Sequence, residues 1–364
     1  MDRQKMWFFL NHWTYLSPEK REKLLLRTGD IEELFSFRTA ELPMLQEELS
    51  IYALSQHEEL HDEEKISEAW ERMEETGIHY VSREEPAFPK RLLQVTPLIP
   101  GLFYKGCLPQ EEAPSVSIIG ARKCSSYGKE TGYFFGKTLG QYGVQIISGM
   151  ALGVDGYAMR GGIAAKAPTF GVLGCGVDIC YPRENIDLYS DLCADPSKNG
   201  VISERPPGYH AVLQTDFPLR NRIISGLCDA LAVIESAHRS GTLITVNYAL
   251  QQNREVFAVP GRIGDRLSEG SNQLIRDGAQ ILLHPEDILQ VLHVDYEGLS
   301  VKKPRVSLTK EEKAVCSCLS NSSEDTDSLL EKTGLPLSEL LEILIRLEVK
   351  GQIRKSTMGG YVRA

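Results

Sequence analysis

The sequence Ser-Val-Ser-Ile-Ile-Gly-Ala-Arg at residues 115–122 places a short run of β-branched residues directly before a glycine. Such a run is typical of a buried strand, and the glycine lets the chain turn sharply into a following helix. The same pattern predicts strands at residues 116–119, 144–147, 170–173, 201–203, 231–234, 256–259 and 281–283. Apolar strands that alternate with helices form a parallel sheet covered on both faces. The sequence therefore predicts a doubly wound, Rossmann-like α/β fold with its ligand crevice at the carboxyl ends of the strands.

Smaller units flank this core. Residues 1–80 predict short helices and resemble small helical modules of the sterile-alpha-motif or helix-hairpin-helix type; Ser17-Pro18-Glu19 is a typical helix start. We expect this helical domain to be followed by the Rossmann-like domain over residues 81–298, a basic linker over 299–307 and a last domain over 308–364.

The last domain is predicted to be a winged helix. Two helices separated by the turn Gly334-Leu335-Pro336 precede two short strands around Gly359-Gly360. The second helix, residues 338–350, carries several glutamates beside its two basic residues, and this charge balance is unsuited to a DNA major groove. The pattern favours protein contact or packing over DNA readout.

Composition restricts the class of protein. Of 364 residues, 42% are hydrophobic and 25% are charged, as in soluble globular proteins. No stretch is apolar enough to cross a bilayer, and residues 1–15 lack the features of a secretory signal, so we expect a cytoplasmic protein without membrane association. The net charge of −10 argues against bulk electrostatic attraction to nucleic acid. A DNA site in this chain would have to be a local basic pocket.

The eight cysteines do not indicate a metal centre. The chain has no Cys-x-x-Cys pair, and no histidine pair has zinc-finger spacing. Cys316-Ser317-Cys318 leaves a metal or redox site open, but we prefer one buried helix face with a neighbouring cysteine. We predict no metal.

Glycine-bearing loops follow four of the predicted strands. Gly120-Ala121-Arg122 leads to Ser125 at the start of a helix; glycine admits a close ligand, the helix N-terminus supplies N–H donors, and arginine suits phosphate. The matching residues of the later loops are Ser148, Gly149, Gly174, Gly176, Ser240, Gly241 and Thr242. Because the carboxyl ends of parallel strands share one edge, we expect these loops to form a single phosphate-binding site.

Other interpretations of these loops remain open. The first loop is equally compatible with an ordinary strand-to-helix turn that carries a surface arginine. It also lacks the Gly-x-Gly-x-x-Gly pattern, so no dinucleotide and no other cofactor is predicted. Asp155 is expected to orient the second loop or to cap the helix after it.

The segment Phe217-Pro218-Leu219-Arg220-Asn221-Arg222 opens an amphipathic helix. Two arginines around an asparagine, just after an aromatic residue, combine phosphate donors with a surface on which a base can stack. The alternative is a buried structural network, in which one arginine pairs with Glu204 or Glu235 and Phe217 belongs to the core.

Several ordered motifs between Pro86 and Leu289 resemble those of the DNA-processing protein A (DprA/Smf) family. They are Gly120-x-Arg122, Ser148-Gly149-x-Ala151-x-Gly153-x-Asp155, Gly174-x-Gly176-x-Asp178-x-x-Tyr181-Pro182, Phe217-Pro218-x-Arg220-Asn221-Arg222-Ile223, Ser240-Gly241-Thr242 and Val259-Pro260-Gly261. The resemblance implies non-catalytic binding of single-stranded DNA, a homodimer formed through the Rossmann-like domain, and loading of the RecA recombinase during natural transformation or recombination.

The resemblance also implies which residues line the strand-binding pocket: Gly120, Arg122, Gly149, Phe217, Arg220, Asn221 and Arg222. One departure concerns the residues before Phe217. Many family members carry a lysine or histidine there, whereas this chain has Gln214-Thr215-Asp216. This departure leaves the affinity of that side of the pocket uncertain.

Two other functions compete with strand binding. Phosphoribohydrolases of the cytokinin-activating (LOG) type place a glutamate shortly after a Gly-Thr motif, but here Ser240-Gly241-Thr242 is followed by Leu243-Ile244-Thr245, without a carboxylate. The other alternative is a nucleotide-binding protein that senses or makes a small ligand. Assays of strand binding and of base release from AMP separate these functions.

Overall fold

The computed structural model describes residues 1–42, 49–296, 308–319, 324–349, 353–355 and 360–363. The chain divides into two compact units, Met1–Gly298 and Leu299–Ala364. The four-part division predicted from the sequence remains a proposal, and its linker, residues 299–307, lies outside the described residues.

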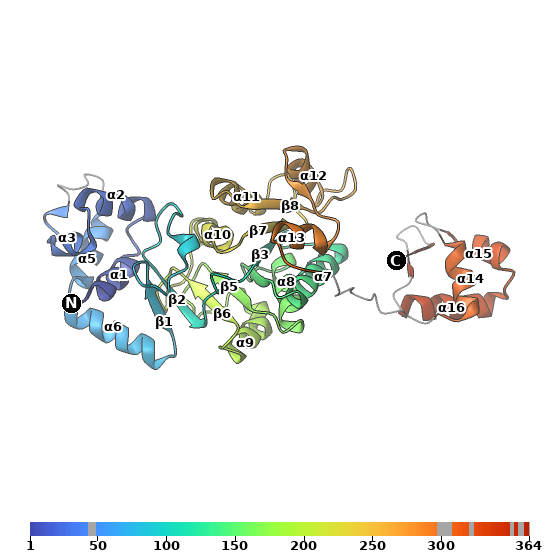
Figure 1. Ribbon diagram of the computed structural model, residues 1–364, viewed down its shortest axis with the longest axis horizontal. Helices are drawn as coiled ribbons and strands as arrows, with labels where there is room; N and C mark the ends of the chain where they lie inside the picture. Colours follow the sequence, from blue (N-terminus) through green and yellow to red (C-terminus); the bar gives the residue numbers. More distant parts are fainter. Residues whose placement is uncertain (43–48, 297–307, 320–323, 350–352, 356–359, 364) are drawn as a thin grey trace. The chain divides into compact units, whose positions relative to one another are not determined.

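The first unit is built on a nine-stranded sheet, counted over the described residues, with the order β1-β2-β6-β5-β4-β3-β7-β8-β9 (Figure 1). Its strands are β1 (His79–Ser82), β2 (Gly101–Gly106), β3 (Ser115–Ile119), β4 (Gln145–Ser148), β5 (Thr169–Leu173), β6 (Gly200–Ser203), β7 (Ala230–Val233), β8 (Glu255–Ala258) and β9 (Gln280–Ile281). All pairs from β6 across to β9 are parallel, and β1 and β2 add an antiparallel edge.

The chain passes from β3 outward to β6 and then returns to β7 on the other side of β3. This reversal defines a doubly wound sheet. The predicted fold class is confirmed, and each predicted strand is present with ends shifted by at most about two residues, as is usual for element boundaries.

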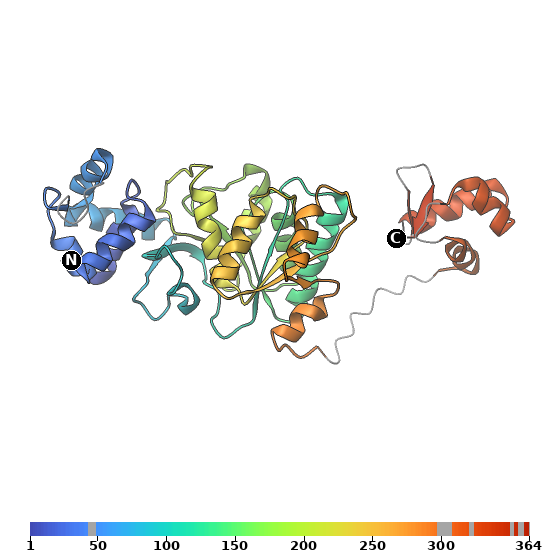
Figure 2. The same ribbon diagram turned by 90° about the horizontal axis from the view of Figure 1, so that it is seen from above.

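Helices cover both faces of the sheet (Figure 2). One face packs against α7 (Ser126–Gln141), α8 (Val154–Ala164), α9 (Ile186–Ala194) and α13 (Pro285–Val291). The other packs against α10 (Asp216–Leu227), α11 (Thr242–Gln251) and α12 (Glu269–Arg276). Strand β7 shows why both faces are apolar: Leu231 and Val233 enter the core beneath α10 and α11, whereas Ala230 and Ala232 enter the opposite core.

Helices α7 and α8 touch through their backbones. Glycines 128, 132, 136 and 140 recur at four-residue spacing along α7. A methyl group at Gly136 would lie 2.0 Å from the carbonyl oxygen of Ala158, so no larger residue fits in this arrangement. Gly153, at φ 78°, is similarly close to the backbone of Ala121. The loops that precede these two helices are therefore held against each other.

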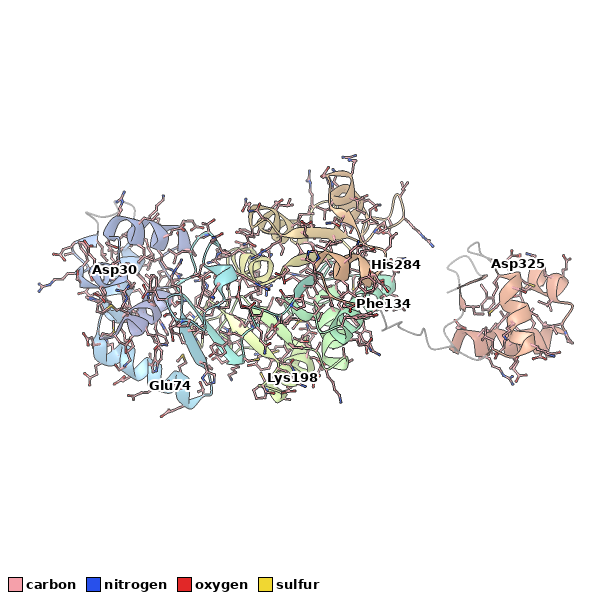
Figure 3. The ribbon with its side chains drawn as sticks, viewed as in Figure 1. Asp30, Glu74, Phe134, Lys198, His284 and Asp325 are labelled. Atoms are coloured by element: carbon pink, nitrogen blue, oxygen red, sulfur yellow. The ribbon has the colours of Figure 1, made fainter. Side chains whose placement is uncertain are left out.

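The N-terminal helices are α1 (Arg3–His12), α2 (Pro18–Thr28), α3 (Ile31–Ser36), α5 (Ile51–Leu60) and α6 (Glu63–Glu75). Their core contains Phe8 and Trp13 and extends onto Tyr80 and Phe103 of β1 and β2. Asp30, labelled in Figure 3, begins α3 by accepting a hydrogen bond from the Ile31 amide and pairs with Arg3 at 2.7 Å. The antiparallel pair of β1 and β2 thus packs against these helices at the edge of the sheet. The sequence analysis did not predict this pair of strands.

The buried histidine of α5 makes these helices sensitive to acid. His57 is 1% exposed, and burial, aided by His61, lowers its pKa to about 4, so the folded protein keeps it neutral. An unfolded histidine takes up a proton near pH 6.5, so the stabilisation is complete above that pH and is lost as the pH falls towards 4. We expect about 2 to 3 kcal/mol to be lost in this window.

Denaturant unfolding at pH 7, 5.5 and 4.5 measures this effect. The pH dependence should be smaller in His57→Gln than in the parent, while His79→Gln, at an exposed position, should behave like the parent. Equal slopes in parent and His57→Gln would contradict the assignment.

The second unit contains α14 (Lys310–Cys318), α15 (Thr326–Thr333), α16 (Leu337–Val349) and the antiparallel pair β10 (Ile353–Lys355) and β11 (Tyr361–Arg363). Gly334, at φ 65°, ends α15 at the predicted turn. The helix-turn-helix and strand pair agree with the winged-helix prediction, whose Gly359 lies outside the described residues. The exposed side of α16 carries Leu337, Leu341 and Ile345.

Candidate phosphate-binding site

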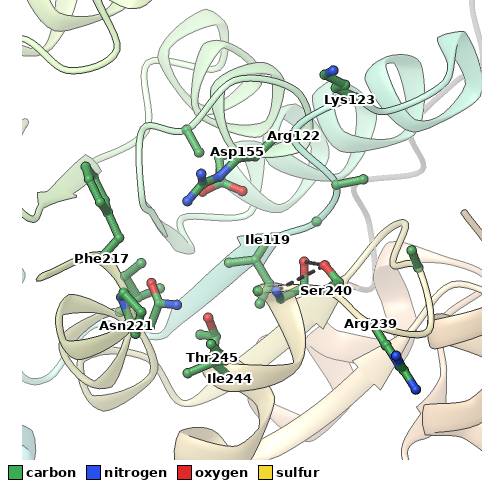
Figure 4. A pocket seen from close by; sticks show the side chains of 18 of the residues that line it. Ile119, Arg122, Lys123, Asp155, Phe217, Asn221, Arg239, Ser240, Ile244 and Thr245 are labelled. Carbon is green, nitrogen blue, oxygen red and sulfur yellow. Dashed lines mark hydrogen bonds between the residues drawn. The ribbon is translucent and has the colours of Figure 1, made fainter. Parts of the chain in front are cut away.

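A cavity of about 720 Å³ opens at the carboxyl edge of the sheet, between β3 and β7 (Figure 4). These are the strands between which the chain order reverses, the position where doubly wound sheets bind ligands. Its lining comes from the loops after β3, β4, β7 and β8, from the segment before α10, and from α8, α10 and α11. The predicted location of the site therefore coincides with a real cavity.

The loop after β3 contributes Gly120, Ala121, Arg122 and Lys123 to the lining. A Cβ atom at Gly120 would lie 2.7 Å from Val154, so a side chain there would push the loop away from α8. Arg122 and Lys123 are exposed, and within the described residues neither side chain has a hydrogen-bond or ion-pair partner. Both are free to meet an anion.

Ser125 does not line this cavity. Its amide donates to Glu235 Oε2 at 2.9 Å, its hydroxyl donates to the other Glu235 oxygen, and the hydroxyl accepts from the Gly128 amide at 3.1 Å. A buried carboxylate thus already occupies the N-terminus of α7. The structure thus places Ser125 outside the cavity, with its amide and hydroxyl donors used inside the protein.

The loop after β4 supports the cavity from behind. Ser148 is fully buried and donates to the Ile118 carbonyl oxygen, while the Gly149 amide donates to Asp155 at 3.2 Å. Ser148 and Gly149 do not line the cavity, so their predicted ligand contact is replaced by contacts within the protein. Asp155 does line it. Burial raises the pKa of its carboxyl, an effect that the nearby Arg220 opposes.

The loop after β5 also lies away from the cavity. Gly174 packs against the ring of Phe217, and Gly176 packs against the backbone of Pro206 and Gly208. The structure therefore does not bring Gly174 and Gly176 together with the predicted residues that line the cavity. Their small size instead allows the neighbouring loops to pack closely.

Helix α10 presents one face to the cavity, formed by Phe217, Arg220, Asn221 and Ile224. Arg220 is 6% exposed; its Nη1 donates to the carbonyl oxygens of Val172 and of Gly149, the latter at 2.8 Å. Its Nε donates to Asn221 Oδ1 at 3.2 Å. Burial lowers the pKa of Arg220 to about 10, so the side chain stays charged at neutral pH.

Phe217 stands between charged and aromatic groups. The guanidinium carbons of Arg122 and Arg220 lie 5.8 and 5.6 Å from its ring centroid, and the ring of Tyr181 lies 5.0 Å from it. Phe217 is only 7% exposed, so most of its ring is packed inside the protein, as the alternative interpretation held. The small part that reaches the cavity lies beside guanidinium groups, an arrangement suited to contact with a base whose phosphate is bound nearby.

Arg222 points away from the cavity. It is 0% exposed, its Nη2 donates to Glu204 at 2.8 Å, and its Nε donates to the Pro97 carbonyl oxygen at 3.1 Å. Burial would raise the pKa of Glu204, but Arg222, Arg21 and Arg205 together hold it below its ordinary value. The structural pairing with Glu204, considered as the alternative, is observed, and Arg222 is not among the residues that line the cavity.

The loop after β7 brings Ser240, Gly241 and Thr242 to the cavity, at the N-terminus of α11. The Ser240 hydroxyl accepts from the Thr242 amide at 3.2 Å and donates to the Thr242 hydroxyl at 3.0 Å (Figure 4). The space beside Gly241 is open. The N-terminus of α11, with its partial positive charge and free N–H groups, therefore borders the cavity.

The sequence of this lining identifies the family. A sequence model described as DNA recombination-mediator protein A matches residues 79–293, more than half of the chain. The chain belongs to this family. A second model, described as the DprA winged helix domain, matches residues 302–357, which confirms the winged-helix prediction.

Relatives in this DprA family cover most of the chain. Protein Smf of Escherichia coli K12 is 34% identical over 298 residues, which are 80% of this chain and 79% of that protein. DNA processing protein DprA of Bacillus subtilis is 36% identical over 219 residues, 60% of this chain and 72% of that protein.

Solved DprA structures share the fold. The crystal structure from Streptococcus pneumoniae aligns with a TM-score of 0.68 and 28% identity, covering 80% of this chain and 98% of that one. The protein from Helicobacter pylori, whose single-stranded DNA binding mode was studied structurally, aligns with a TM-score of 0.52 and 24% identity, covering 59% of this chain and 96% of that one.

The site of this DprA family member contains basic residues that the motifs did not indicate. Lys123, Arg239 and Arg266 join Arg122 and Arg220 in the lining, against one carboxylate, Asp155, in the described part of the chain. Arg239 directly precedes Ser240-Gly241-Thr242, and Arg266 follows Val259-Pro260-Gly261, so position after a strand end was the signal for both. The cavity is therefore strongly basic in a chain of net charge −10.

Within the described residues, no three His, Cys, Asp or Glu side chains lie together as a set of metal ligands. None of the helices placed by the structure combines the length and apolarity needed to cross a bilayer.

Proposed function

We propose that this chain binds single-stranded DNA without cleaving it, with strand phosphates held in the cavity between β3 and β7. The observation that carries the proposal is the lining itself, which contains four cations that have no hydrogen-bond or ion-pair partner in the described residues, together with the start of α11. Guanidinium groups and free helix N–H groups are the usual protein ligands of phosphate. The four cations of the lining are Arg122, Lys123, Arg239 and Arg266.

The aromatic residue favours a single strand over a duplex. Phe217 sits inside the lining, beside Arg220, rather than on a protruding surface. A base can reach such a ring only when it is unpaired, because the bases of a duplex are stacked on one another. The relatives named for DNA processing, and the single-stranded DNA binding described for the Helicobacter pylori protein, support this choice.

Non-catalytic binding is supported by how the polar groups are used. The carboxylate in the lining, Asp155, accepts a hydrogen bond from the Gly149 amide. The Ser240 hydroxyl bonds within its own loop, with Thr242, rather than with a histidine or carboxylate that would activate it. A site that holds phosphate by charge, without an activated nucleophile, binds the strand and releases it unchanged.

The remaining parts of the proposal rest on family membership. We propose that the bound strand is passed to the RecA recombinase during natural transformation or recombination, that the protein acts as a homodimer, and that it works in the cytoplasm, where RecA and its DNA substrates meet.

Competition binding tests the function. A labelled oligonucleotide of about 16 nucleotides should be displaced by unlabelled single strands of any sequence at far lower concentration than by duplex of the same length, because backbone contacts carry little base preference. Duplex competing equally well would contradict the proposal. Incubation with AMP and with DNA, with and without Mg²⁺, should give no product; base release that disappears in Asp155→Asn would instead establish a hydrolase.

A further inference from the structure

The loop between β8 and α12, residues 259–268, forms one wall of the cavity. Arg266 and Leu267 from this loop line the cavity opposite α10. Residues 259–265 of the same loop continue beyond the lining.

The stem of the loop is held firmly. Gly261 and the Asn272 side chain exchange two hydrogen bonds, of 3.0 and 3.1 Å. The Ser236 amide, at the end of β7, donates to the Leu267 carbonyl oxygen at 2.8 Å. These bonds tie both ends of the loop to the sheet edge and to α12, so the position of its tip is defined by the fold.

Asp265 shapes the tip into a tight turn. Its amide donates to the Arg262 carbonyl oxygen at 3.2 Å, and its carboxylate accepts from the Leu267 amide at 3.1 Å. Gly264, at φ 83°, provides the left-handed conformation that the turn needs. Arg262 begins this turn and Arg266 directly follows Asp265, and both residues are exposed.

The tip presents an unusual combination of side chains. Ile263 is 100% exposed, and Arg262 is exposed without a hydrogen-bond or ion-pair partner in the described residues. A single exposed isoleucine needs no explanation by itself. Here it projects between two unpaired arginines, one of which, Arg266, already belongs to the cavity lining.

We infer that the DNA strand leaves the cavity across this loop, with Arg262 and Arg266 contacting phosphates and Ile263 packing against a base. The inference rests on the proposed function and extends its site to nucleotides outside the cavity. A polyanion with apolar bases matches both the charge and the apolar tip, and the loop is continuous with the cavity. Arg262 would then act only on strands long enough to reach it.

Strand length provides the test. Binding of labelled oligo-dT of about 4 and about 16 nucleotides, the range of known single-strand site sizes, is measured for the parent, Arg262→Ala and Ile263→Ala at several salt concentrations. Both variants should bind the long oligomer about 3- to 10-fold more weakly and the short one as the parent does. Arg262→Ala should also lower the salt slope for the long oligomer by about 0.7, the value for one single-strand phosphate contact.

Two controls make the outcome specific. Arg122→Ala, inside the cavity, should weaken binding at both lengths, and Lys166→Ala, an exposed lysine before β5 at the opposite sheet edge, should change neither. The inference is overturned if the loop variants bind both oligomers as tightly as the parent does. It is also overturned if the variants weaken the binding of both oligomers to the same extent. If the parent binds neither oligomer, the proposed function itself fails, and the two failures are thus told apart.

Discussion

Replacement of Arg222 by alanine is expected to lower the free energy of unfolding by about 3 to 5 kcal/mol, the usual loss when one member of a buried ion pair is removed. The substitution leaves Glu204 buried with Arg21 as its nearest remaining cation, 3.7 Å away and outside hydrogen-bonding distance. It also removes the bond to the Pro97 carbonyl oxygen. A buried carboxylate without a close partner is costly, so the protein should unfold at much lower denaturant concentration.

Urea unfolding of Arg222→Ala beside Arg122→Ala measures this difference. The two substitutions remove the same side chain, but Arg122 is exposed and unpaired, so its loss should change the free energy of unfolding by less than about 0.5 kcal/mol. Weakened DNA binding by Arg222→Ala with an unchanged unfolding transition would restore Arg222 as a DNA ligand.

The double substitution Arg122→Ala with Arg239→Ala is expected to weaken single-strand binding by about a hundredfold or more. Each arginine has no partner within the described residues, and each lines the cavity from a different loop. Loss of a charged hydrogen bond to phosphate costs about 1.5 to 3 kcal/mol, and every 1.4 kcal/mol is a factor of ten in affinity. The two losses need not add fully, since both residues are expected to contact the same strand.

Binding isotherms across a salt series, together with thermal melts, separate a ligand role from a structural one. The double variant should melt with the parent and show a salt slope lower by about 1.4, which corresponds to two single-strand phosphate contacts. Lys166→Ala serves as the matched loss of an exposed charge outside the site. An unchanged salt slope would show that neither arginine contacts phosphate.

The parallel sheet was predictable because its central strands are buried on both faces and so appear as short apolar runs, such as residues 116–119 directly before Gly120. The β1–β2 hairpin lacks this signal. It lies within a proline-rich segment, and its residues belong to a core shared with the N-terminal helices, such as Tyr80 and Phe103. Contacts between distant segments of the chain decided that part of the fold.

Helix geometry explains why one arginine of α10 lines the cavity and another does not. Successive residues of a helix turn by about 100°, so Phe217, Arg220, Asn221 and Ile224 share a face. Arg222 is two positions from Arg220 and lies on the far side, where Glu204 receives it. Helical periodicity separates the two arginines, but only the tertiary structure shows which face meets the cavity.

The glycine-bearing loops show a second reason why the site could not be predicted completely from the sequence. Glycines after strands indicated four candidate loops, yet Gly174 and Gly176 pack against other loops and Ser125 bonds to Glu235. A glycine pattern records where backbones approach closely, without showing whether the neighbour is a ligand or the protein itself. Arg239 and Arg266, which line the cavity, also follow strand ends, but so does Arg205, which is buried and paired with Asp216.

Mapping the contact point of a bound strand tests the central claim most directly. An oligo-dT of about 16 nucleotides in which single thymines are replaced by 5-iodouracil is bound to the full-length protein, irradiated and digested, and the crosslinked peptides are identified by mass spectrometry. We expect the crosslink at Phe217 or at Tyr181, whose ring lies 5.0 Å from it, and we expect it to disappear in Arg122→Ala with Arg239→Ala. Crosslinks confined to residues 308–364, unaffected by the double substitution, would place the strand on the winged-helix unit and contradict a binding site at the carboxyl edge of the sheet.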